Sequence, residues 1–367
     1  MSARDPTPEG AGIGMINPQM VTLARLSRGL TQAELARHLK FTQGTVSKIE
    51  AGTSSVDGAQ LEALADALQY PATFFERFEP VDGPGVAELY HARKRKTIRV
   101  MALHRAYATA TIKRMHIETL LRSVESPDAF SFPIFPADEF GDAEKIARTV
   151  RSQLEVPLGP IHNMTETIET AGGIAIECDF ETRQIDGFTR WRHPVFPPLF
   201  FLNRHLPPDR WRWTAAHELG HAVMHTNQYP SDSMEDEANA FAEEFLMPRQ
   251  LIRHQLLNLS FPRLASLKTY WKVSIQALIN RAYTLQLVTP RQRSYMFMQW
   301  SRAGYRLREP EELDPPAEPP HAVTELINYH LKALGYTVPE LAKTLDLREA
   351  EFRAQYLAGE RALHLLK

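Results

Sequence analysis

The chain has 367 residues, and at roughly 100–200 residues per domain this length predicts two or three domains. Its 42 Lys and Arg residues nearly balance 44 Asp and Glu residues. The net charge of −2 excludes nucleic-acid binding through overall basicity and leaves only a local basic surface. The single cysteine, Cys178, excludes an internal disulfide framework and fits a reducing compartment. The N-terminus lacks the apolar core of a signal peptide, and no apolar run reaches about 18 residues. We therefore expect a cytoplasmic protein with no membrane partner.

The hydrophobic spacing predicts a mainly helical chain with a small β-sheet near its middle, which is an α+β fold. Residues 309–320 contain five acids and five prolines, a composition typical of a linker. The expected order is a disordered N-terminus (1–15), a domain of four or five short helices (16–80), a basic helical connector (81–137), a mixed domain with strands in 172–180, 183–190 and 198–203 (138–305), a Pro-rich acidic linker (306–320) and a helical C-terminal element (321–367).

Residues 30–52 predict two helices of about eight residues each, joined by a tight turn. Thr31 is a suitable N-cap, and Glu34 three residues later completes a capping box. Thr42 opens the second helix in the same way, and Gly52 ends it. A helix pair of these lengths with this turn is the geometry of a helix-turn-helix.

The second helix of this pair carries polar side chains on its outward face, of types that reach base edges and phosphates. The expected contacts to double-stranded DNA are Gln43, Gly44, Thr45, Ser47 and Lys48. Gln32 opens the first helix, where it could hold a phosphate at the helix N-terminus. Residues 17–50 contain five Lys or Arg and two acids, a local charge of +3. The alternative is an ordinary helical hairpin with a solvated polar face.

The run T-Q-x-x-L-A-x-x-L, followed by T-x-x-T-V-S-K-I-E-x-G, closely resembles the lambda-repressor-like (XRE-type) helix-turn-helix domain. The resemblance covers roughly residues 16–75 and implies a five-helix domain. It also implies a homodimer whose second helix reads paired half-sites of a double-stranded operator in the major groove. The operator sequence does not follow from it.

Residues 214–225 read TAAHELGHAVMH and predict a helix that can bind zinc. His217 and His221 are four residues apart, so they lie on one helix face and can share one tetrahedral Zn²⁺. Glu218 can then take a proton from the attacking water, as a general base. The flanking residues are apolar, which predicts partly buried imidazoles that need a partner. The alternative is a helix with solvated histidines.

The following helix, within residues 234–248, offers a third ligand. Glu235 lies 14 residues after His221, and Asn239 shares its face, so the pair supplies a carboxylate and an amide that can orient one histidine. Glu237 is the competing ligand and lies on a different face. A solvated acidic helix face is the alternative for all of these acids.

The combination R-W-R-W-T-x-A-H-E-L-G-H and E-x-E-A-N-A-F-A-E-E-F-L-M-P closely resembles the ImmA/IrrE-type metallopeptidases over roughly 140–290. The resemblance implies a gluzincin-like fold with Zn²⁺ on His217, His221 and Glu235 and with Glu218 as the base. It implies cleavage of a regulatory protein, either another repressor or the chain itself. The alternative is a DNA-binding regulator, of phage or toxin–antitoxin type, whose peptidase-like domain is a non-catalytic sensor or partner-binding domain.

In such folds an edge strand beside the cleft aligns the substrate, and we expect it at residues 198–203, with Asn203 near the cleft. His225 and Tyr229 are candidates to stabilise the oxyanion, although structural roles are commoner for both. Eight Lys or Arg residues between 93 and 114, without an acid, could contact DNA phosphates or pair with the acids of 232–244.

The tail over 331–357 resembles a second, degenerate helix-turn-helix. Its expected outward face is acidic and would repel phosphates, with Glu340, Asp346, Glu349 and Glu351. We interpret the tail as a packing or dimerisation element.

Overall fold

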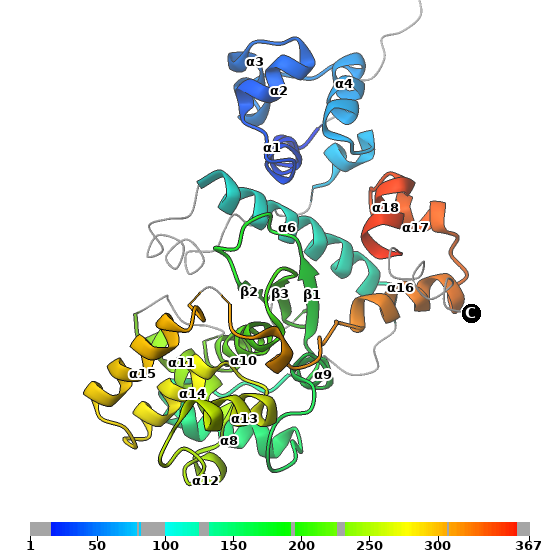
Figure 1. The fold of residues 1–367 in the computed structure, drawn as a ribbon. Helices are drawn as coiled ribbons and strands as arrows, with labels where there is room; N and C mark the ends of the chain where they lie inside the picture. The colour runs from blue at the N-terminus through cyan, green and yellow to red at the C-terminus, as the bar shows by residue number, and fades with distance from the viewer. Residues whose placement is uncertain are drawn as a thin grey trace, which may run out of the picture. The chain divides into compact units, whose positions relative to one another are not determined.

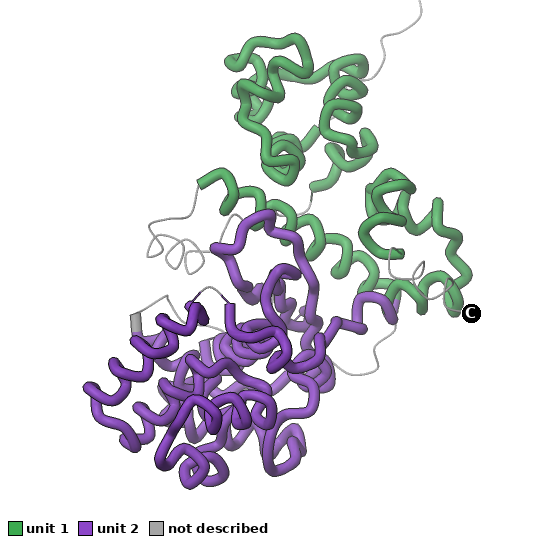
Figure 2. The backbone as a smooth tube through the Cα atoms, in the orientation of Figure 1, with its two compact units in different colours: residues 1–85, 97–123, 326–367 green, residues 86–96, 124–325 purple. Residues whose placement is uncertain are grey.

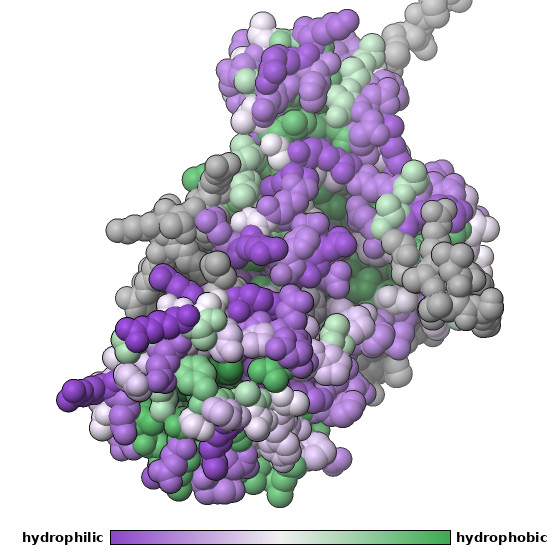
Figure 3. Space-filling view, in the orientation of Figure 1, coloured by the Kyte–Doolittle hydropathy of each residue, from purple (hydrophilic) through white to green (hydrophobic). Residues whose placement is uncertain are grey.

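The computed structural model describes residues 16–78, 81, 100–124, 132–191, 195–225, 232–306 and 308–357. These residues are mainly helical, with one three-stranded sheet, which confirms the predicted α+β class (Figure 1). The chain forms two compact units: unit 1 contains residues 1–85, 97–123 and 326–367, and unit 2 contains 86–96 and 124–325 (Figure 2). Hydrophilic side chains cover most of the visible face, and apolar ones are scattered over it (Figure 3). None of the described helices is long and apolar enough to cross a membrane.

Unit 1 begins with the predicted run of short helices. They are α1 (Pro18–Ser27), α2 (Gln32–Leu39), α3 (Gln43–Glu50), α4 (Gly58–Leu68) and the 3₁₀ turn η1 (Ala72–Glu76). The Thr31 hydroxyl caps α2, and Glu34 closes the predicted capping box by accepting the Thr31 amide hydrogen at 2.8 Å. The Thr42 side chain caps α3. Local side-chain hydrogen bonds thus satisfy backbone groups at the N-termini of both helices.

The remaining helices of unit 1 come from distant parts of the chain. They are α6 (Val100–Leu121), α16 (Ala322–Lys332, whose first residues belong to unit 2), α17 (Val338–Thr344) and α18 (Glu349–Tyr356). Leu341 and Phe352 are fully buried in one core with Leu35 and Phe75. The C-terminal element, expected as a separate segment, therefore packs with the first helix-turn-helix because its apolar faces are buried there.

Helix α6 contains most of the described part of the predicted basic connector. Arg114 donates to Glu118 at 2.9 Å, and both side chains are only 2% exposed. Because Arg114 is buried and paired with Glu118 one helical turn away, it is not available to a DNA phosphate. The cations from Arg93 to Arg99 lie outside the described residues.

Unit 2 contains helices around a small sheet. The elements are α7 (Ala137–Phe140), α8 (Ala143–Gln153), α9 (Met164–Thr170), β1 (Ile174–Cys178), β2 (Gly187–Arg190), β3 (Leu199–Asn203), α10 (Pro208–Met224), α11 (Asp232–Leu246), α12 (Arg249–Ile252), α13 (Phe261–Trp271), α14 (Ile275–Thr284), α15 (Pro290–Arg302) and η2 (Glu311–Leu313). Helix α10 packs against the sheet on one side and against α11 on another. This arrangement matches the expected sheet on the predicted zinc helix.

The strand order in the sheet is β1-β3-β2, with β1 parallel and β2 antiparallel to β3. The prediction that residues 198–203 form the edge strand is therefore wrong, since β3 lies in the centre. All five residues of β3 are buried, as expected for a strand with a neighbour on each side. In β2, buried and half-buried residues alternate. Among the described strands, β2 is the edge next to α10.

The prediction that residues 306–320 form an acidic linker is also wrong, because residues 308–320 are fixed to the rest of unit 2 by ion pairs and hydrogen bonds. Glu318 pairs with the fully buried Arg212 and accepts the Met164 amide hydrogen at 2.8 Å. Glu309 lies 3.1 Å from the fully buried Lys268. Acids that composition alone assigns to solvent instead neutralise buried cations that arise far away in the sequence.

Candidate metal centre and DNA-reading helix pair

Helices α10 and α11 approach closely enough for their side chains to meet at one point. Gly220 lies between the two histidines of α10, and a Cβ atom added there would be 3.0 Å from the Phe241 ring of α11. Only glycine permits this approach without displacing Phe241. Helix α11 begins at Asp232, two residues before the predicted range of 234–248, so that Glu235 lies within its first turn.

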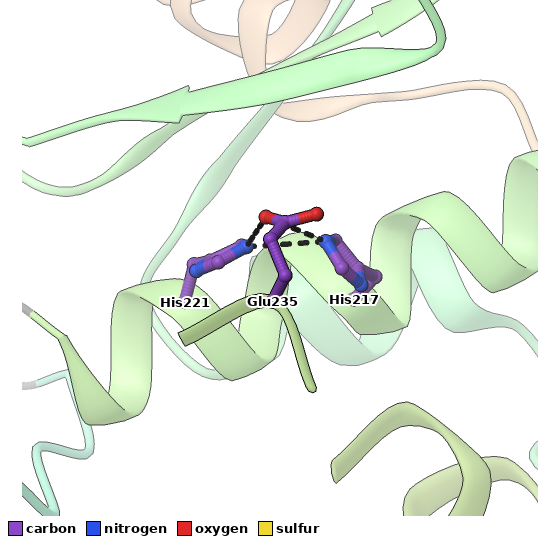
Figure 4. Close-up of side chains that lie close together, drawn as sticks. All are labelled: His217, His221 and Glu235. Atoms are coloured by element: carbon purple, nitrogen blue, oxygen red, sulfur yellow. Dashed lines mark hydrogen bonds and ion pairs between the residues drawn. The ribbon is translucent and has the colours of Figure 1, made fainter. Parts of the chain in front are cut away.

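The structure brings His217, His221 and Glu235 together around one point (Figure 4). The two histidine Nε2 atoms are 3.1 Å apart, and Glu235 Oε1 lies 3.0 Å from His221 Nε2 and 3.7 Å from His217 Nε2. A tetrahedral ion with bonds of about 2.0–2.1 Å holds its ligand atoms about 3.3–3.4 Å apart. The three atoms therefore match one triangular face of a zinc site.

The outer nitrogen of His217 is held by the residue expected to do so. Asn239 Oδ1 lies 3.1 Å from His217 Nδ1, and an amide oxygen can only accept, so Nδ1 carries the hydrogen in this bond. In the neutral imidazole, Nε2 then presents its lone pair to the centre. Asn239 thus fixes the tautomer that a metal requires.

The outer nitrogen of His221 has a partner that the sequence analysis did not assign. His225 Nδ1 lies 3.0 Å from His221 Nδ1, and His225 Nε2 lies 2.8 Å from Glu237 Oε2. Burial lowers the pKa of His225, which favours the neutral ring. A neutral His225 that donates to Glu237 must accept from His221, which leaves the lone pair of His221 Nε2 facing the centre. His225 and Glu237 therefore form a hydrogen-bonded pair behind the ligand His221, which we call the relay. The sequence analysis predicted other roles: His225 as an oxyanion donor and Glu237 as a competing ligand.

The electrostatics of the centre suit a cation. Burial acts to raise the pKa of Glu235, but the two histidines beside the carboxylate outweigh burial and hold the pKa well below its usual range. Burial lowers the pKa of His221 to about 4. Burial also acts to lower the pKa of His217, but its hydrogen bond to Glu235 and the charge of Glu218 raise it overall. A charged carboxylate and a neutral His221 are the ligand forms that a metal needs. A proton on His217 Nε2 would compete with the metal for that nitrogen.

Glu218, the predicted base, is oriented by a residue that the sequence did not reveal. The Thr189 hydroxyl of β2 donates to Glu218 Oε2 at 2.9 Å, and Glu218 is buried. The bond fixes one carboxylate oxygen and joins the edge strand to the helix that carries the histidines. No sequence pattern links Thr189 to Glu218, since the contact depends on how β2 packs against α10.

Two other predicted cleft residues are accounted for differently. Asn203 is fully buried in β3, where its amide donates to the carbonyl oxygens of Thr182 and Ile185 at 2.7 Å each. Its side chain holds the segment before β2 and does not line the metal centre. Tyr229 lies outside the described residues.

In unit 1, a hydrogen-bond chain connects the two helices of the predicted DNA reader. Gln43 Nε2 donates to Gln32 Oε1 at 2.7 Å, and Gln32 Nε2 donates to Glu50 at 2.9 Å. Glu50 in turn is paired with Arg25 of α1 through two bonds of 2.5 and 2.9 Å. This chain of bonds fixes the orientation of both glutamine side chains. Gln43, Gly44 and Lys48 are exposed, and Thr45 and Ser47 are half-buried.

Comparison with known proteins matches two separate parts of the chain to two families. Residues 170–283 match a peptidase family described as the IrrE N-terminal-like domain, and residues 22–75 match a helix-turn-helix family. Two relatives described as uncharacterised HTH-type transcriptional regulators, from Sinorhizobium medicae and Rhizobium meliloti, are each 33% identical over 72 residues. The match covers 18% of this chain and 52% of each relative, so the chain spans about half the length of the curated relatives it matches. The chain thus joins an XRE-type helix-turn-helix domain to an IrrE N-terminal-like domain.

Proposed function

We propose that this chain is a DNA-binding transcriptional regulator whose second domain is a zinc metallopeptidase. Its substrate would be a regulatory protein, either another repressor or the chain itself. The observation that carries the proposal is the convergence of His217, His221 and Glu235, with Glu218 next to the first ligand. A structural site would need a fourth protein ligand, whereas three ligands leave a position for water or substrate. Among the described residues, the cluster contains three.

The roles of the residues follow from their geometry. Zinc, when bound, supplies a Lewis acid that polarises the scissile carbonyl and makes water a better nucleophile. Glu218 accepts the proton of that water and delivers it to the departing amine. Thr189 keeps Glu218 in one orientation by its 2.9 Å hydrogen bond. Asn239 and His225 orient the two histidines from behind.

Strand β2 is the proposed substrate-aligning edge. In the described part of the sheet it pairs with β3, and a substrate peptide that adds to β2 as an extended strand would lie along the edge next to α10. Thr189 lies on this strand and contacts the base, which places the edge beside Glu218. The expected role of residues 198–203 therefore passes to Gly187–Arg190.

A second candidate function is a sensor domain without turnover. The observation that favours it is the order of the chain, in which residues 124–325 of unit 2 interrupt the residues of the DNA-binding unit. Both chain connections of the IrrE-like domain thus lead into that unit. In this alternative, the metal or a bound partner would alter operator binding. The substitution Glu218→Gln separates the two functions because it removes the base and keeps the three ligands.

DNA binding is expected to depend on Lys48. Lys48→Ala should weaken binding to a mixed-sequence DNA duplex by about 3- to 10-fold and reduce the slope of log K against log salt by about one, because one phosphate contact is lost. Lys343→Ala is the matched control, since it removes one exposed lysine from α17. Fluorescence anisotropy over a series of salt concentrations measures both quantities. Equal losses for the two variants would contradict the assignment of α3 as the DNA-reading helix.

The relay behind His221 is expected to strengthen zinc binding. Glu237→Ala should lower zinc affinity by about 10-fold, since partners behind a ligand typically contribute 10- to 100-fold. Asp236→Ala is the matched control, because it removes an exposed acid from the next position of the same helix. Competition with a chromophoric chelator measures both affinities. If the two variants bind zinc equally well, the relay does not support the ligand.

A further inference from the structure

The C-terminal helices repeat the first helix-turn-helix at one constant offset along the chain. Both helix pairs begin after a glycine with positive φ, and both open with a threonine capping box, at Thr31 with Glu34 and at Thr337 with Glu340. The corresponding residues are Gly29 and Gly335, Leu35 and Leu341, Ala36 and Ala342, Leu39 and Leu345, and Val46 and Phe352. All of these apolar residues are buried. The second helices, Gln43–Glu50 and Glu349–Tyr356, correspond from end to end.

The turn between the helices has the same backbone in both copies. Lys40 and Asp346 both adopt the left-handed conformation, with φ of 57° and 52°. The next amide donates to a carbonyl five residues back, from Phe41 to Ala36 and from Leu347 to Ala342, at 2.9 Å in both copies. The same turn also ends α4, α8 and α14, so it is a common helix ending, and what supports the correspondence is its matching position between the two helices of each pair.

The DNA-reading positions differ between the copies in a consistent direction. Glu349 and Glu351 stand where the first module has Gln43 and Thr45, and Ala354 stands where it has Lys48. Two carboxylates at the start of α18 favour the helix dipole but repel phosphates. The second helix of the second module therefore carries two acids against one cation, Arg353, and has no lysine at the position of Lys48.

The buried Arg25–Glu50 ion pair of the first module is absent from the second. Leu331 and Tyr356 occupy the corresponding positions and pack against the shared core. Tyr356 also lies 2.8 Å from the buried His116 of α6 through its hydroxyl group. Replacing an ion pair with apolar groups is compatible with stable packing, so the second module keeps the fold without the polar chain that orients the glutamines.

Charged groups of the second module contact the first directly. Glu351 accepts two hydrogen bonds from Arg28, at 2.8 and 2.9 Å. Asp346 accepts from Thr73 at 2.5 Å and from Arg77 at 2.9 Å. The Arg77 and Asp346 side chains are only 12% and 14% exposed, so this contact is largely shielded from solvent.

We propose that α16–α18 form a second helix-turn-helix module whose partner is the first module of the same chain and which does not read DNA. Glu351, at a DNA-reading position, binds Arg28 of the first module instead of a nucleic acid. Arg348 of the second module makes a third charged contact, to Asp66 of α4 in the first module, at 2.8 Å. Because the IrrE-like domain lies between the modules in sequence, this docking ties both ends of that domain to the DNA reader.

A charge swap in the full chain tests the docking. Glu351→Arg should accelerate amide hydrogen exchange in 337–357 by about 10-fold, because it places two cations together. The double variant Arg28→Glu with Glu351→Arg should restore protection to within about 3-fold of wild type. Glu349→Gln is the matched control and should change little, because Glu349 is exposed and its pair with Arg353 of the same helix is screened by solvent. Unchanged exchange in Glu351→Arg, or a double variant as unprotected as the single, would overturn the docking.

A DNA measurement tests the second half of the proposal independently. Arg353 is the exposed cation of α18, at the position that corresponds to Ser47 of α3. Arg353→Ala should leave affinity for a mixed-sequence duplex and its salt slope unchanged, in contrast to Lys48→Ala. If Arg353→Ala weakens binding as much as Lys48→Ala does, the second module reads DNA and the proposal fails.

Discussion

Replacement of Glu218 by glutamine is expected to lower the rate of peptide-bond cleavage by about 10²–10⁴-fold while zinc affinity stays near that of the wild type. Glutamine has the size of glutamate and can still accept the 2.9 Å hydrogen bond from Thr189, but it cannot take a proton from water. The three ligands remain in place, so only the base is lost. The expected loss is therefore in catalysis and not in metal binding.

The measurement pairs cleavage with metal content. Zinc-loaded chain is incubated alone and with an extract of host cells that lack the gene, and new protein N-termini are labelled and counted by mass spectrometry. Asp236→Asn serves as the control, because it neutralises an exposed acid near the site and should cleave like wild type. N-termini that appear equally with wild type and Glu218→Gln would contradict the peptidase proposal. No cleavage by wild type, with regulation intact in Glu218→Gln cells, would favour the sensor.

The second large effect is expected at Lys268, whose replacement by methionine should lower the free energy of unfolding of unit 2 by about 3–5 kcal/mol. Lys268 is fully buried and pairs with Asp209 in the first turn of α10, and lies 3.1 Å from Glu309 and 3.2 Å from Asp314. Burial acts to lower the pKa of Lys268, but these carboxylates outweigh it and raise the pKa. Asp314 also pairs with Arg308, but removing Lys268 would leave the buried carboxylates of Asp209 and Glu309 without this cation.

Tryptophan fluorescence isolates this effect, because all five tryptophans of the chain lie in unit 2. Urea unfolding of Lys268→Met is compared with wild type and with Lys145→Met, which removes an exposed lysine from α8. The control should lie within about 0.5 kcal/mol of wild type. A loss of less than about 1 kcal/mol in Lys268→Met would show that the cluster is not needed to hold residues 308–320 on the domain.

The features that could be predicted from sequence are those that depend on local spacing. His217 and His221 share a face because of helix geometry alone, and the Thr31 capping box is complete within four residues. Glu235 and Asn239 also follow from helix spacing once a second helix is assumed. His225 carried the same signal, since it lies one turn beyond His221, but its partner could be named only from the structure.

The features that could not be predicted depend on contacts between distant segments. The acids of residues 308–320 look solvated until Lys268 and Arg212 are known to lie beside them. Thr189 reaches Glu218 only because β2 packs against α10, a contact that the sequence does not show. For β3, a signal was available: the run LFFL has no polar alternation, which is typical of a strand covered on both sides.

The central claim is that His217, His221 and Glu235 hold one metal ion, and zinc content tests it most directly. Full chain is purified with zinc supplied, dialysed and analysed by mass spectrometry for zinc per chain, as wild type, Glu235→Ala and the matched Asp236→Ala. We predict about one zinc in wild type and in Asp236→Ala, and a loss of most of it in Glu235→Ala. Wild-type chain without zinc, or equal zinc in all three proteins, would contradict the account.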